Sequence, residues 1–140
     1  MIDCLIIGDS IAVGAHAFKT ECVVFARGGI NSWQFNQMYP MALDATSVII
    51  SLGSNDHVGV RTQHELEAVR ARVHGKRVFW ILPAGNSAAS NVPITKVQAV
   101  VREIAAVNGD IVLEIPSLQP DHIHPSWAGY RALMERVDGR

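Results

Sequence analysis

A serine, an aspartate and a histidine in this chain have the types and spacing of a nucleophile with its base. Ser10 follows a short apolar run, and Asp121 precedes His124 by three residues within one expected loop. A serine hydroxyl becomes a useful nucleophile when a neighbouring imidazole accepts its proton. On one loop, the Asp121 carboxylate can hold imidazole Nδ1 while Nε2 faces Ser10. These residues predict covalent catalysis on Ser10, with His124 as base and Asp121 as its partner.

Donors for a developing negative charge are also present. Asn55 offers a side-chain N–H, Gly29 offers a backbone N–H with no side chain in the way, and Ser10 offers its own amide. Together they would form an oxyanion hole with three donors. Ser10 stands where a helix is expected to begin, and an N-terminus of a helix favours negative charge. The alternative interpretation of Ser10 is a helix N-cap, because serine is a preferred capping residue.

Short apolar runs alternate with segments of helical periodicity along the whole chain. Strands are expected over 3–8, 21–26, 47–52, 77–82 and 111–115, with helices over 10–19, 31–40, 62–75, 93–108 and 126–137. This alternation predicts an α/β fold, a three-layer α/β/α sandwich with a five-stranded parallel sheet. The expected strand order is flavodoxin-like, 2-1-3-4-5. No linker or repeat interrupts the pattern, so residues 1–140 are expected to form one domain.

The polar residues occupy the same end of the expected strands. Ser10 follows the first strand, Gly29 the second, Asn55 the third, and the loop with Asp121 and His124 follows the fifth. Open parallel sheets bind ligands beyond the carboxyl ends of their strands. We therefore expect these residues to meet at one edge of the sheet.

These motifs resemble a known family. In order, Gly8-Asp9-Ser10, Gly29, Gly53-Ser54-Asn55-Asp56 and Asp121-His122-Ile123-His124-Pro125 resemble the four sequence blocks of the SGNH (GDSL-type) hydrolases. The resemblance implies a serine esterase or acylhydrolase on a flavodoxin-like fold. It also implies Ser10 as nucleophile, Ser10, Gly29 and Asn55 as oxyanion donors, His124 as base and Asp121 as its partner.

The chain departs from the family pattern at a few places. Ile11 stands where leucine is usual. Gly28 is the alternative to Gly29 as the oxyanion glycine; Gly29 is preferred because the polar pair Asn31-Ser32 follows it, as in the family. The chain is short for this family, which predicts a shallow, open cleft or one completed by another subunit or domain. No long apolar stretch suggests a lipid tunnel, so a short acyl group such as acetyl is expected.

Several neighbouring residues receive a structural interpretation. Asp9 is expected to brace its turn by hydrogen bonds to nearby N–H groups, and Asp56 to be a loop residue. Residues 62–65 have the form of a capping box that begins a helix. Of the tryptophans, which more often belong to a core or rim, Trp127 is the best candidate for a wall of the acyl pocket. His57 and His122 lie beside motif residues and are not assigned a catalytic role.

Composition limits the classes of partner. The 12 Lys and Arg residues balance 13 Asp and Glu residues with no basic stripe, which argues against nucleic acid or an anionic membrane. No apolar run reaches the ~18 residues that a membrane span needs. Substrates are expected to be small-molecule or carbohydrate esters, with no metal or organic cofactor, and association of identical chains is left open.

The cysteines and the N-terminus bear on location. Cys4 and Cys22 are expected to be buried as small hydrophobes, which favours a reducing compartment. The first strand begins at the N-terminus and no signal peptide is visible, so a cytoplasmic location is expected. A signal removed before this sequence was numbered would leave no trace in it.

Two other classes of function compete with an esterase. A non-catalytic ligand- or protein-binding module could use the same edge of the sheet, because fold does not determine function. The combination of Ser10, Asn55, Asp121 and His124 disfavours it, since a module without catalysis has no need of all four. A nucleotide or flavin binder fits the strand order, but the sequence lacks a glycine-rich phosphate loop.

Overall fold

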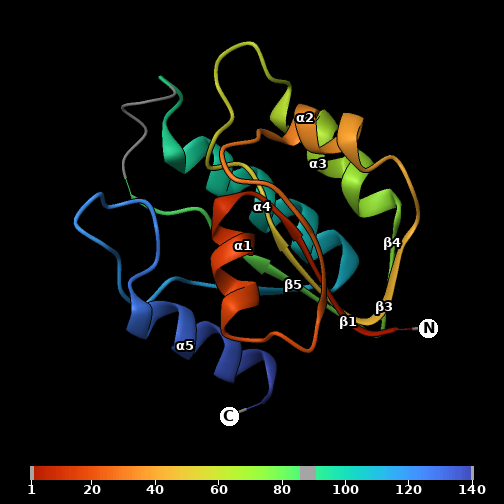
Figure 1. The fold of residues 1–140 in the computed structure, drawn as a ribbon. Coiled ribbons are helices and arrows are strands. Elements are labelled where there is room, and N and C mark those ends of the chain that lie inside the picture. Colours follow the sequence, from red (N-terminus) through yellow and green to blue (C-terminus); the bar gives the residue numbers. More distant parts are fainter. Residues whose placement is uncertain (1, 86–90, 140) are drawn as a thin grey trace.

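A computed structural model describes residues 2–85 and 91–139 as a sheet with helices on both sides (Figure 1). The strands are β1 (Ile2–Gly8), β2 (Val23–Ala26), β3 (Leu43–Ser51), β4 (Val73–His74), β5 (Arg77–Ile81) and β6 (Ile111–Leu113). The helices are α1 (Ser10–Ala17), α2 (Ser32–Met38), α3 (Thr62–Ala71), α4 (Ile94–Asn108) and α5 (Trp127–Val137). Residues 86–90 of the loop expected over 83–93 lie outside the described residues. None of the described helices has the length and apolar character required to cross a lipid bilayer.

The strands are parallel, in the order β2-β1-β3-β5-β6. This confirms the predicted order 2-1-3-4-5, because β5 and β6 are the fourth and fifth strands of the sequence pattern. The unexpected element is β4, whose two residues pair with Leu43 and Asp44 of β3 off the main path of the sheet. Helix α3 ends at Ala71, before the expected stop near Gly75, and the residues that follow it form this short strand.

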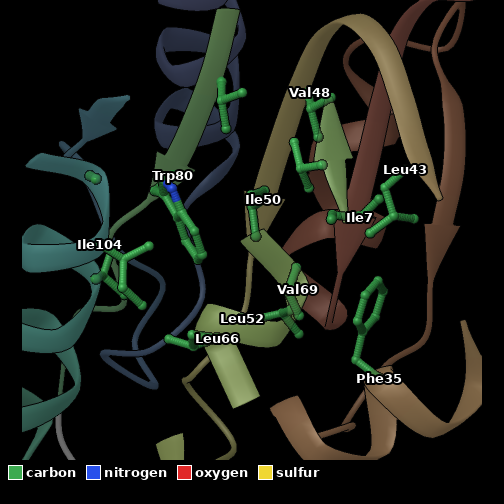
Figure 2. Packing of buried hydrophobic residues seen from close by; sticks show 14 of the residues in the cluster. Ile7, Phe35, Leu43, Val48, Ile50, Leu52, Leu66, Val69, Trp80 and Ile104 are labelled. Atoms are coloured by element: carbon green, nitrogen blue, oxygen red, sulfur yellow. The ribbon is translucent and has the colours of Figure 1, made fainter. Parts of the chain in front are cut away.

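Two apolar clusters cover the two faces of the sheet. Ile7 packs in the cluster with Leu66 of α3 and residues of α2 and α4 (Figure 2), whereas Ile6 packs with Leu133 and residues of α1 and α5. Successive strand residues point to opposite faces, so strands covered on both sides are apolar throughout. This confirms the predicted three-layer sandwich. Apolar packing on both faces also fixes the positions of the strands, so the loops that follow them begin at rigid points.

Helix α1 begins directly after β1, with Asp9 as its N-cap. The Asp9 carboxylate accepts hydrogen bonds from the backbone N–H of Ile11 at 3.0 Å and from the Ser51 hydroxyl at 3.1 Å. The prediction that Asp9 braces the turn is therefore confirmed, and the alternative that Ser10 is the cap is wrong. Asp9 is fully buried, and burial raises the pKa of its carboxyl to about 6.

The capping box expected at Thr62 is wrong. Arg61 occupies the N-cap position of α3 without a side-chain hydrogen bond, and the Thr62 hydroxyl donates to Asp56 Oδ2 at 2.8 Å. Thr62 is instead the first residue of the helix, one position past the cap, and its hydroxyl donates to a carboxylate, which accepts more strongly than a neutral group. A capping box forms instead at α2, where Asn31 and Gln34 exchange hydrogen bonds of 2.8 and 2.9 Å.

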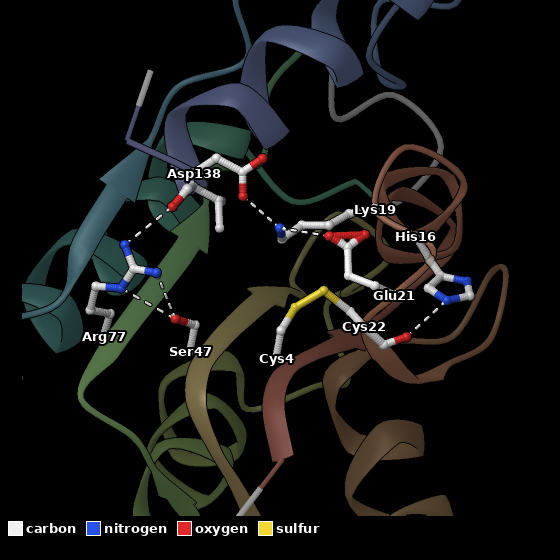
Figure 3. A network of polar contacts seen from close by, with 9 residues as sticks. Cys4, His16, Lys19, Glu21, Cys22, Ser47, Arg77 and Asp138 are labelled. Atoms are coloured by element: carbon white, nitrogen blue, oxygen red, sulfur yellow. Dashed lines mark hydrogen bonds and ion pairs between the residues drawn. A yellow bond between two sulfur atoms is a disulfide. The ribbon is translucent and has the colours of Figure 1, made fainter.

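Cys4 and Cys22 form a disulfide (Figure 3), so the prediction of two free buried thiols is wrong. The register explains the pairing. Leu5 of β1 pairs with Val23 of β2, so the cysteines that precede these two residues face each other, with Cα atoms 4.8 Å apart. Disulfides persist in oxidising surroundings. The cysteines therefore give no support to a reducing compartment, and the expectation of a cytoplasmic location loses that argument.

Polar contacts surround the disulfide at the edge of the sheet where the strands begin (Figure 3). Lys19 pairs with Asp138 at 2.5 Å and with Glu21 at 3.2 Å. Arg77 donates to the Ser47 hydroxyl at 3.0 Å and to a backbone carbonyl at the end of α5. These contacts join α1, α5 and the sheet far from the loops that follow the strands.

The disulfide is expected to stabilise the fold. It closes a loop with a sequence separation of 18, for which the chain-entropy relation gives about 3 kcal/mol. Urea unfolding of the double variant Cys4→Ala/Cys22→Ala should show a loss of that order, and reductant should shift only the wild type. Equal unfolding midpoints for the wild type with and without reductant would contradict this.

The buried Asp9 predicts a pH dependence of stability. Its raised pKa means that the folded state binds the proton more tightly, so its contribution to stability is present below pH 3.8 and is lost as the pH rises to about 6. Between pH 4 and 7, the wild type should lose about 2 kcal/mol of unfolding free energy relative to Asp9→Asn. Subtracting the unfolding free energy of Asp9→Asn at each pH cancels the contributions of the other titrating groups. Parallel stability curves for the two proteins would exclude the effect.

Candidate active site

The residues expected at the carboxyl ends of the strands do gather at one edge of the sheet. Because β1, β2, β3, β5 and β6 are parallel, the loops that follow them open on the same side. Ser10 and His124, which are 114 positions apart in the sequence, are in direct contact there. A Cβ at Gly28 would lie 3.9 Å from that of Ser10, and Asn55 reaches the loop that follows β2.

Ser10, His124 and Asp121 form one chain of hydrogen bonds. The Ser10 hydroxyl oxygen lies 2.8 Å from Nε2 of His124, and Nδ1 of the same ring lies 2.6 Å from Asp121 Oδ2. Ser10 is half-buried, whereas the His124 and Asp121 side chains are 34% and 41% exposed. The reactive edge is therefore open to a molecule from solution.

The Asp121 carboxylate determines which imidazole nitrogen carries the proton. Its hydrogen bond with the His124 ring, and those from the backbone N–H groups of Ile123 and His124, lower its pKa to about 2. An ionised carboxylate only accepts hydrogen bonds, so Nδ1 is the donor to it. Nε2 of the neutral ring is then free to accept the Ser10 hydroxyl proton.

The loop after β6 holds His124 through its own backbone. Leu118 and Pro125 form an antiparallel bridge, and the N–H of Gln119 donates to the carbonyl of His124 at 2.8 Å. His122 takes a left-handed conformation, with φ 58°. The turn also packs against Gly85, where an added Cβ would lie 1.2 Å from the His122 carbonyl oxygen. Glycine at position 85 thus permits the close approach of the two loops.

A second close approach sets the position of Ser10. A Cβ at Gly8 would lie 1.8 Å from the Ser51 carbonyl oxygen, so only glycine lets β1 end beside β3 in this way. The next residue, Asp9, caps α1, which leaves Ser10 as the first helical residue. Its backbone N–H is among those without an intrahelical partner.

The two other predicted donors lie on adjacent loops. Nδ2 of Asn55 donates to the Ile30 carbonyl at 3.0 Å, which uses one of its two amide hydrogens. Gly29 has φ 79° and open space where a side chain would be. A Cβ at Gly28 would lie 3.9 Å from that of Ser10, whereas a Cβ at Gly29 would have no heavy atom within 4 Å. The assignment of Gly29 rather than Gly28 as an oxyanion donor stays a prediction.

Asp56 joins these loops. Its buried carboxylate accepts from the backbone N–H of Ser32 at 2.8 Å, from the Ser32 hydroxyl at 2.6 Å and from the Thr62 hydroxyl at 2.8 Å. The expectation of a structural loop residue is confirmed. Its role is larger than the sequence indicated, because it fastens the start of α2 to the loop that carries Asn55.

Three neighbouring candidates lie outside the hydrogen-bonded chain. His57 is exposed and accepts the backbone N–H of Gly59 at Nδ1. His122 contributes its backbone to the turn, as described above. Trp127 packs edge-on against Phe18, with ring centroids 5.3 Å apart, at the end of α1 that is remote from Ser10. This position does not make it a wall of the site.

Two cavities lie along the start of α2, and neither was expected from the sequence. One, of about 450 Å³, is lined by Gly28, Gly29 and Trp33 among others, and the next, of about 440 Å³, also contains Trp33. Trp33 is 51% exposed. The capping box at Asn31 was the available signal, since it places Trp33 in the first turn of α2 beside the glycine loop.

Among residues 2–85 and 91–139, no cluster of His, Cys, Asp and Glu is arranged to hold a metal ion.

Comparison of the sequence with protein-family models and with curated proteins finds no match. Solved structures do match. A GDSL-like lipase from Bacteroides thetaiotaomicron is 18% identical, with a TM-score of 0.68 over 96% of this chain and 86% of that chain.

Two further structures are similar over nearly the whole chain. The C-terminal catalytic domain of a peptidoglycan O-acetyltransferase from Streptococcus pneumoniae is 14% identical, with a TM-score of 0.68, and the match covers 99% of this chain and 91% of that one. A carbohydrate acetylesterase family member from Sinorhizobium meliloti is 13% identical, with a TM-score of 0.63 over 99% and 96%. This chain therefore has the α/β fold of solved GDSL-like lipases and acetylesterases.

Proposed function

We propose that this protein is a serine hydrolase that cleaves a carboxylic ester with a short acyl group, such as acetyl, through an acyl-enzyme on Ser10. The observation that carries the proposal is the chain from the Ser10 hydroxyl to His124 and Asp121, with distances of 2.8 and 2.6 Å. That chain has the order of nucleophile, base and orienting carboxylate. The substrate is a small-molecule or carbohydrate ester.

In the first half-reaction, Ser10 Oγ attacks the ester carbonyl carbon while Nε2 of His124 takes the hydroxyl proton. The tetrahedral intermediate collapses, the bond to the alcohol oxygen breaks, and His124 returns the proton to that oxygen. In the second half-reaction, water attacks the acyl-enzyme and gives its proton to His124. Ser10 then leaves the acyl carbon and recovers a proton, which releases the carboxylic acid.

Three donors would hold the oxyanion of each intermediate. The backbone N–H of Ser10 lies at the N-terminus of α1, and Asn55 retains one amide hydrogen beyond the one that it gives to Ile30. Gly29 would add a backbone N–H. Donors that are already oriented stabilise the charge of the transition state without having to move during the reaction. Such preorganised stabilisation supplies much of the rate enhancement of many enzymes.

The comparisons support ester chemistry and a small acyl group. Their names include a lipase, an O-acetyltransferase domain and a carbohydrate acetylesterase, all on this fold. An acetyl group also suits an edge whose side chains remain partly exposed and show no deep apolar tunnel among the described residues.

Hydrolysis of p-nitrophenyl esters tests the proposal. We expect kcat/KM to fall from acetyl to butyryl to octanoyl, and His124→Ala to lower kcat by about 10⁴-fold, because Ser10 then lacks its base. His74→Ala is the matched control: that imidazole also lies 2.8 Å from a carboxylate, Asp44, but on the remote strand β4. Wild-type rates in His124→Ala, or no turnover by folded wild type, would contradict the proposal.

A further inference from the structure

The two cavities share Trp33 and Gln34 in their linings, so they adjoin at the start of α2, and together they are called the groove below. At one end the groove is lined by Gly28, next to the Ser10 side chain. At the other it reaches Arg61. A substrate with its ester carbonyl at Ser10 would extend its alcohol part or its acyl part into this groove.

The groove combines an uncovered indole with two arginines. Trp33 is 51% exposed, and its ring stacks on no other aromatic ring of the described residues. Arg27 and Arg61 line opposite parts of the groove, and neither side chain makes a hydrogen bond or ion pair with a described residue. By contrast, Arg70 is held by Asp110 through two hydrogen bonds.

One carboxylate, Glu65, also lines the groove. Glu65 is 9% exposed, and its Oε1 accepts from the Asn36 side chain at 2.9 Å, away from open solvent. The two exposed guanidinium groups outnumber this one carboxylate among the charged side chains that line the groove. A guanidinium has a fork of donors that fits the oxygens of a carboxylate or a sulfate.

We propose that this groove binds the alcohol part of the substrate as an acidic sugar. The inference rests on the proposed ester hydrolysis at Ser10. The apolar face of a sugar ring would lie on the Trp33 indole, whose flat surface gives contact at little entropic cost. The anionic group of the sugar, a carboxylate or a sulfate, would pair with Arg27 or Arg61. Both contacts lie away from the reacting carbonyl, so they should act mainly on KM.

Matched substrates give the first test. O-acetylated trisaccharides of equal linkage and length are compared in three forms: neutral, with uronate carboxylates, and with sulfates. We expect kcat/KM to be about fivefold or more higher for the acidic forms, and the preference to shrink as salt screens the exposed charges. The uronate and sulfate forms distinguish the two sources of charge.

Substitutions assign the preference to the groove. Arg27→Gln and Arg61→Gln should each reduce the ratio of acidic to neutral kcat/KM by about twofold through a change in KM, and the double variant should bring the ratio close to one. Trp33→Ala should raise KM for all three sugars by a similar factor. The matched control pair is Trp127→Ala and Arg131→Gln, an exposed indole and a guanidinium 5.5 Å from its ring on α5, for which no change in the ratio is expected.

Binding to Ser10→Ala separates this inference from the proposed function. Titration calorimetry with the unacetylated trisaccharides needs no turnover, and the acidic forms should bind at least fivefold more tightly than the neutral form. Equal binding of all three, or a wild-type ratio retained in the double variant Arg27→Gln/Arg61→Gln, overturns the inference while p-nitrophenyl acetate turnover upholds the esterase. Selective binding with no turnover of any ester contradicts the esterase and supports the groove.

Discussion

The parallel sheet brings the Ser10 hydroxyl and His124 Nε2 into contact, because it sends the ends of two distant strands to the same side. The two residues are 114 positions apart: Ser10 begins the helix after β1, an interior strand, and His124 lies in the loop after β6, the strand at one edge of the sheet. Parallel pairing sends both strand ends to the same side, and apolar packing on both faces holds them there. Loops on such a scaffold can present side chains within hydrogen-bond distance.

Buried carboxylates connect this scaffold to the site. Asp9 caps α1 directly before Ser10, and Asp56 joins the starts of α2 and α3 beside Asn55. Burying a charge is costly unless hydrogen bonds compensate. Asp56 has three donors, whereas Asp9 Oδ2 has no partner among the described residues, and the pKa of Asp9 rises accordingly. Stability is thus reduced at the turn that presents the proposed nucleophile.

The strands and the edge where the polar residues meet could be predicted from the sequence, because apolar runs and the turns after them are local patterns. Pairings between distant segments could not. The Cys4–Cys22 bond depends on the register of β1 against β2, and the Thr62 hydroxyl turns to Asp56 because folding brings that carboxylate within reach. Trp33 was expected, with the other tryptophans, in the core or rim, and its 51% exposure beside a cavity depends on how α2 packs against the rest of the fold.

Intact-mass analysis after treatment with a fluorophosphonate, followed by peptide mapping, tests most directly whether Ser10 is a nucleophile. Such a probe reacts with a serine whose hydroxyl is activated by a neighbouring base. We expect one adduct per wild-type chain, on Ser10, and none on Ser10→Ala or His124→Ala. A folded wild type that stays unlabelled, or an adduct on another serine that persists in Ser10→Ala, would contradict it.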